Sequence, residues 1–105
     1  MRALIGTRKG LFELERLRAG WHLSEPRFLG TAVTCARKLG ATWVALEHGH
    51  WGPKLHRSRG GGFEEVACPA FPEGHSDAVV RRVMTIASGG GEDKLWAGTD
   101  PGGLF

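Results

Sequence analysis

Residues 43–58 read WVALEHGHWGPKLHRS, in which two short apolar runs flank a turn rich in glycine. Two runs of this length around two glycines and a proline are typical of a β-hairpin. The part from Leu46 to Ser58 also carries three histidines, a tryptophan and two cations. We therefore expect a hairpin here, with either a functional site or an ordinary connecting turn at its tip.

The hairpin pattern occurs twice more, in residues 3–15 (ALIGTRKGLFELE) and in residues 95–105 (LWAGTDPGGLF). The third segment repeats the Gly-Thr and the Leu-Phe pairs of the first. The interval between hairpins, about 40 to 50 residues, is the length of one four-stranded propeller blade. The repeat therefore predicts an all-β chain built from similar units.

Further strand candidates lie between the hairpins. They are residues 20–26 (GWHLSEP), 30–40 (GTAVTCARKLG), 63–68 (FEEVAC) and 78–88 (AVVRRVMTIAS). The last has apolar residues at helical spacing, but its β-branched content and the SGGGED that follows favour a strand. With the strands of a blade named A to D from the inside outward, the chain runs B, C, D, then A to D, then A, B and part of C.

The sequence thus predicts one domain, residues 1–105, holding about two and a half four-stranded antiparallel blades of a partial β-propeller. Their approximate bounds are 1–28, 30–70 and 77–105. Residues 40–67 should contain strands B, C and D of the middle blade, with a tight turn near Gly60 to Gly62 and no helix between Trp43 and Val66.

The three hairpins and the strand candidates resemble the opening blades of sialidase-like, or BNR-repeat, β-propellers, a family often labelled glycosyl hydrolases and related in fold to photosystem II assembly propellers. The resemblance implies a propeller and does not by itself imply hydrolysis. Members usually carry an Asp-box turn, Ser-x-Asp-x-Gly-x-Thr-Trp, between strands C and D. Here residues 58–66 read SRGGGFEEV and have no aspartate.

The amino-acid composition narrows the classes of partner and the cellular location that we expect. The net charge is +3, but the ten arginines are scattered with no run longer than two, which argues against a nucleic-acid surface. Cys35 and Cys68 form no metal-binding or disulfide pattern, so we expect buried thiols. The N-terminus has only three consecutive apolar residues, far short of a membrane span or signal peptide. We expect a cytoplasmic protein without membrane contact.

A ligand-binding rim is the first functional hypothesis. In a propeller the three turns between strands B and C emerge on one face. The residues expected there are Arg8, Lys9, Glu47, His48, His50, Trp51 and Asp100. An aromatic platform with charges of both signs suits a carbohydrate or another polar small molecule. The alternative is that Trp51 packs against the neighbouring blade.

A metal site and a hydrolytic site are the alternatives to this rim. His48, His50 and His56 would suit zinc if the first two continued a strand, but the glycines favour a loop, so we expect no metal and no cofactor. Glycoside hydrolysis needs paired carboxylates, for which Asp100 and Glu47 are weak candidates. Sialidases employ a tyrosine nucleophile, and this sequence has no tyrosine.

The interpretation that the sequence favours is that the chain is a fragment or short form of a sialidase-like propeller and acts as a binding or scaffold unit. One alternative is a glycoside hydrolase completed by missing blades or by self-association. Another is a truncated gene product without function. Open strand edges at both ends would also allow self-association.

Overall fold

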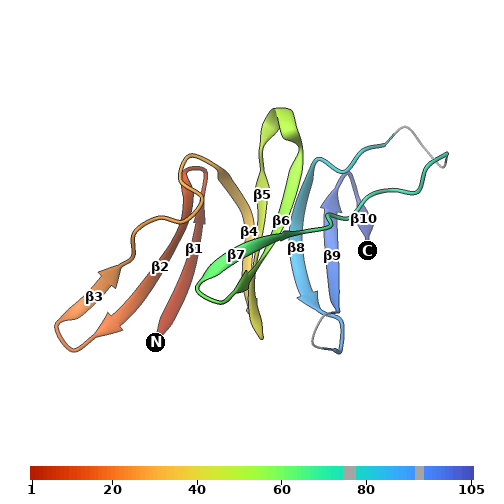
Figure 1. Ribbon diagram of the computed structural model, residues 1–105. Coiled ribbons are helices and arrows are strands. Elements are labelled where there is room, and N and C mark those ends of the chain that lie inside the picture. Colours follow the sequence, from red (N-terminus) through yellow and green to blue (C-terminus); the bar gives the residue numbers. More distant parts are fainter. Residues whose placement is uncertain (75–77, 92–93) are drawn as a thin grey trace.

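The computed structural model describes residues 1–74, 78–91 and 94–105, and shows three antiparallel sheets arranged one after another along the chain (Figure 1). The first sheet contains β1 (Arg2–Thr7), β2 (Gly10–Leu17) and β3 (Gly20–Leu23). The second contains β4 (Ala32–Leu39), β5 (Ala41–Glu47), β6 (Pro53–Arg59) and β7 (Gly62–Val66). The third contains β8 (Arg82–Ser88), β9 (Leu95–Asp100) and β10 (Gly103–Leu104). The all-β prediction is confirmed.

The three hairpins repeat one strand register. Leu11 lies opposite Gly6 in β1–β2, Leu55 opposite Ala45 in β5–β6, and Leu104 opposite Gly98 in β9–β10. Neighbouring positions on the other face of each sheet also correspond: Ile5 with Phe12, Val44 with His56, and Ala97 with Phe105. The similarity seen in the sequence is therefore a similarity of three-dimensional position.

The second sheet is apolar on both faces because it lies between the other two. Trp43, Ala45 and Leu55 pack with Val83, Ile86 and Ala97 of the third sheet. Val44 and Leu46, on the opposite face of β5, pack with Leu11 of the first sheet. Alternate residues of a strand point to opposite faces, so a run of four buried residues, Trp43 to Leu46, requires a layer on each side. This explains why the central run has no polar alternation.

Strand β8 confirms the choice of strand over helix for residues 78–88, although it begins only at Arg82. Its pairing with β9 shifts between Val83 and Thr85, which marks a β-bulge. A bulge inserts one extra residue, so Val83 and Ile86 share the buried face although they are three residues apart. The spacing that suggested a helix therefore comes from the bulge.

The middle hairpins follow the prediction, with one difference. The turn between β6 and β7 falls at Gly60 and Gly61, both with positive φ, as expected. One turn of 3₁₀ helix, Gly49–Trp51, lies between β5 and β6, where no helix was expected. It is confined to the loop and leaves both strands intact. Asp77 and Asp93 lie outside the described residues.

Candidate functional site

Three hairpin turns gather at one end of the molecule, where β1–β2, β5–β6 and β9–β10 reverse direction (Figure 1). We call this end the turn end. The sequence-predicted rim residues in these turns or at their borders are Arg8, Lys9, Glu47, His48, His50, Trp51 and Asp100. Turn residues that are far apart in the sequence therefore lie at the same end of the molecule (Figure 1).

The turn between β5 and β6 is well defined by backbone hydrogen bonds. The N–H of His48 donates to the carbonyl of Gly52 at 3.1 Å, and the N–H of Gly52 donates to Gly49 at 3.2 Å. Both glycines adopt positive φ, which other residues rarely do. Because β5 ends at Glu47, His48 and His50 do not continue the strand, and the period of two needed for a shared face does not apply.

Trp51 ends the 3₁₀ turn and is 74% exposed. Its ring meets that of His50 nearly at a right angle, with the centroids 5.3 Å apart. The alternative in which Trp51 packs against a neighbouring sheet is therefore wrong for this structure. The indole presents a wide apolar surface at the turn end.

A pocket of about 740 Å³ opens beside these turns. Its charged and polar lining comes from all three sheets and the segment before β4: Arg8, Thr31, Thr34, Glu47, His48 and Arg82. Three of these, Arg8, Glu47 and His48, were predicted as rim residues. Lys9, His50, Trp51 and Asp100 do not line the pocket. The structure therefore brings together part of the predicted rim and adds threonines that the sequence did not indicate.

Arg82 organises the charges of this pocket. Its Nη2 lies 3.5 Å from Oε1 of Glu47, and its Nε lies 3.8 Å from Oδ2 of Asp100. The two carboxylates that the sequence proposed as an acid and base pair thus share one guanidinium. Sequence reasoning missed Arg82, because its register opposite Asp100 follows from the bulge in β8. The only sequence feature that could have drawn attention to Arg82 was the Arg81-Arg82 pair.

Thr34 fixes the wall of the pocket between the second and third sheets. Its hydroxyl donates to the carbonyl of Val83 at 2.7 Å and lies 3.3 Å from the carbonyl of Ala45. The bond to Val83 connects β4 to β8 near Arg82. Strands β4 and β8 are therefore joined at the height of the pocket.

His56 lies away from this pocket, on β6, where its ring meets that of Phe28 with centroids 5.0 Å apart. Burial lowers the pKa of His56, with His48 and Lys54 acting in the same direction and Glu65 opposing them. Its Nδ1 is buried and has no hydrogen-bond partner among the described residues. Within that part of the chain, no three histidine, cysteine or acidic side chains are grouped so that they could hold a metal ion.

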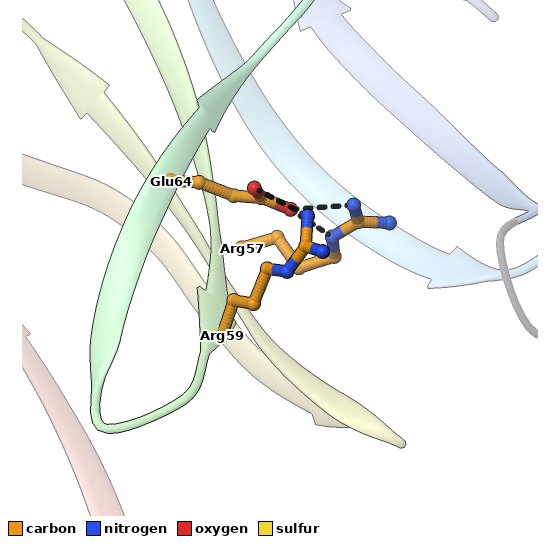
Figure 2. Close-up of polar contacts among 3 residues, drawn as sticks. All are labelled: Arg57, Arg59 and Glu64. Atoms are coloured by element: carbon orange, nitrogen blue, oxygen red, sulfur yellow. Dashed lines mark hydrogen bonds and ion pairs between the residues drawn. The ribbon is translucent and has the colours of Figure 1, made fainter.

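The hairpin between β6 and β7 is held together by charged side chains (Figure 2). Glu64 of β7 accepts hydrogen bonds from Arg57 and Arg59 of β6, with Nε of Arg57 3.1 Å from Oε1. The hydrogen bond from Arg57 is the main reason why the pKa of Glu64 is lowered. Next to the turn of the same hairpin, the hydroxyl of Ser58 accepts the N–H of Thr42 at 2.8 Å. These contacts are structural and lie outside the pocket.

The two cysteines are free and half-buried rather than fully buried. Cys35 and Cys68 pack at the margin of the core between the second and third sheets. Burial raises the pKa of both thiols. A raised pKa keeps a thiol protonated and therefore unreactive, so neither cysteine is a candidate nucleophile.

Comparison with known proteins adds no relative. No family model matches the chain, and no curated protein matches it. Within the described ranges, no helix combines the length and the apolar character needed to cross a membrane.

Proposed function

We propose that this chain is a fragment or short form of a sialidase-like β-propeller. It binds a polar ligand at the turn end, and the first candidate ligand is a glycan. Three successive antiparallel sheets with one repeated hairpin register support the propeller reading. Contacts between the first strands of successive sheets, β1 with β4 and β4 with β8, support it as well. We also propose that the protein is cytoplasmic and has no nucleic-acid or membrane partner.

The observation that carries the binding proposal is the pocket at the turn end, with Arg8, Glu47, His48 and Arg82 in its lining. Sugar hydroxyls both donate and accept hydrogen bonds, and these side chains offer both kinds of partner. A pocket of about 740 Å³ is within the usual size of small-molecule sites. Trp51, exposed at the tip of the adjacent turn, supplies a flat surface for the apolar face of a sugar ring.

Glycoside hydrolysis by Asp100 and Glu47, completed by missing blades or self-association, is the alternative activity. A hydrolytic pair needs one protonated carboxyl group and one ionised group. Here both carboxylates face the same guanidinium, that of Arg82. Both carboxylates are thus engaged by the same cation, so the arrangement favours binding over catalysis. A truncated product without function would bind nothing at this end.

The proposal is tested with an array of neutral and acidic oligosaccharides, followed by titration calorimetry with the best glycan. We expect Trp51→Ala to weaken binding about tenfold or more and to shift Tm by only a few degrees, since an exposed ring contributes contact rather than core. Trp21→Ala, an exposed tryptophan away from the turn end, is the matched control and should leave binding unchanged. Absence of glycan binding in the wild type, or equal loss in both variants, would overturn the proposal.

Turnover distinguishes the hydrolase alternative. If the protein cleaves aryl glycosides, and Glu47→Gln and Asp100→Asn each abolish cleavage while retaining glycan binding, hydrolysis replaces binding as the function. No turnover, together with glycan binding that depends on Trp51, supports the binding unit.

A further inference from the structure

The third sheet exposes a copy of an interface that the second sheet buries. In the second sheet, Trp43 and Leu55 are 4% and 5% exposed because the third sheet covers them. Gly98 in the third sheet occupies the position that Ala45 occupies in the second. Leu104 lies opposite Gly98 as Leu55 lies opposite Ala45, and Trp96, like Trp43, stands two residues earlier in the strand. Trp96 and Leu104 are therefore the counterparts of Trp43 and Leu55. These counterparts are 51% and 72% exposed. We call the face formed by Trp96, Gly98 and Leu104 the trailing face.

The first sheet exposes the other half of the same interface. In the first sheet, Ile5 occupies the position that the buried Val44 occupies in the second. Ile5 and Phe12 share one face of the first sheet, and this face points away from the second sheet. The register extends the face across β3 to the apolar pair Leu14 and Leu23, and to Trp21, which lies opposite Arg16. Ile5, Trp21 and Leu23 are all exposed. We call this surface the leading face.

Within the chain, neighbouring sheets already form this contact. One sheet presents the side equivalent to the trailing face, and the next sheet presents the side equivalent to the leading face. The first sheet offers Gly6 and Leu11 to the second, with Gly6 close against Val33. The second offers Ala45 and Leu55 to the third. The same kind of contact thus occurs twice in succession. Among the described residues, the third sheet has no following sheet and the first has no preceding one (Figure 1).

We propose that a second copy of this chain docks head to tail, so that the trailing face of one copy covers the leading face of the other. One chain carries both halves of an interface that it already forms twice internally, so another copy is the partner whose shape and apolar character match. The contact is heterologous, and such contacts give rings when the rotation closes. Two copies bring six sheets, within the four to eight that propeller rings contain.

This interface uses sheet faces and not the open strand edges that the sequence indicated. Apolar faces drive association because burying them removes them from water. Hydrogen bonding along an edge would instead extend one sheet by further strands. The variants that separate the two are face substitutions that leave the backbone of both edges unchanged.

Light scattering coupled to size exclusion, at micromolar protein, tests the proposal. The wild type should have the mass of a dimer. Trp96→Glu blocks only the trailing face and Ile5→Glu only the leading face, and each should give a monomer. Trp51→Glu places the same charge on an exposed tryptophan outside both faces and should remain a dimer. Far-UV circular dichroism and thermal melting establish that each variant is folded, and Leu104→Glu replaces Trp96→Glu if that variant does not fold.

Mixing the two blocked variants distinguishes head-to-tail docking from a symmetric contact. Trp96→Glu retains an intact leading face and Ile5→Glu an intact trailing face, so an equimolar mixture should regain a one-to-one dimer. A monomeric wild type, or a Trp96→Glu variant that still dimerises through its leading face, overturns the proposal. A mixture of folded variants that stays monomeric does so as well.

Discussion

The guanidinium of Arg82 reaches Glu47 across the boundary between the third and the second sheet, with Nη2 3.5 Å from Oε1. It also faces Asp100 of its own sheet, so one cation serves two carboxylates. All three side chains are between one third and one half exposed. Water and salt therefore screen these ion pairs, and their contribution to stability is small.

Replacing this cation tests how small the contribution is. We expect Arg82→Gln to lower the free energy of unfolding by about 1 kcal/mol or less, and the difference to shrink in about 1 M salt. Urea denaturation at fixed protein concentration measures both. Arg18→Gln, in the turn after β2, removes the same charge far from Glu47 and is the control. A loss of several kcal/mol that salt leaves unchanged would contradict the screened pairing.

The core between the first two sheets should respond to loss of volume. Leu46 is almost fully buried and packs with Leu11 and Val44. We expect Leu46→Ala to cost about 2–5 kcal/mol, through lost apolar burial and the cavity left behind. Leu29→Ala, an exposed leucine, should cost little. Chemical denaturation of the two variants compares the same substitution at two burials, and equal losses would contradict the described core.

Gly6 occupies a position where no side chain fits. A Cβ there would lie 2.8 Å from Cγ1 of Val33 on the adjacent sheet. We expect Gly6→Ala to destabilise by about 1–3 kcal/mol, because the sheets must separate slightly to admit the methyl group. The Cβ of Gly62→Ala meets open space, so that variant should be nearly neutral. Thermal melting of both checks the close approach, which a neutral Gly6→Ala would refute.

His56 should make stability depend on pH. Its pKa in the folded chain is lowered from 6.5 by burial, so the unfolded chain binds the proton more tightly. The folded chain therefore has its full stability above about pH 6.5 and loses part of it as the pH falls through that value toward the lowered pKa. Both hairpins that correspond to β5–β6 have phenylalanine at this position, Phe12 and Phe105.

The substitution His56→Phe should remove this dependence. We expect the variant to gain stability relative to the wild type as the pH falls from about 6.5 to 5, while the difference stays constant between about pH 7.5 and 9, where histidine is neutral in both states. Urea denaturation across this range measures the difference. A difference that does not change with pH would show that His56 is not responsible.

The sequence by itself determined the strands and their grouping. Alternation, glycine turns and the repeated Gly-Thr and Leu-Phe pairs are local signals, so the three hairpins and a strand within residues 78–88 could be predicted without a structure. The sequence did not show that this strand begins only at Arg82. The location of the tight turn at Gly60 and Gly61 followed from the same local chemistry. Arg8, Glu47 and His48 were among the residues predicted to share one end, because in a propeller the turns between strands B and C emerge on one face.

Only the tertiary structure decided which groups meet. Arg82 reaches Glu47 because a bulge sets the register of β8 and because β4 and β8 lie side by side, and neither is encoded in a local pattern. The exposure of Trp51 and the burial of Trp43 depend on which surface another sheet covers. Propensity and periodicity describe a strand and its two faces, whereas contacts between sheets depend on how those faces are brought together in space.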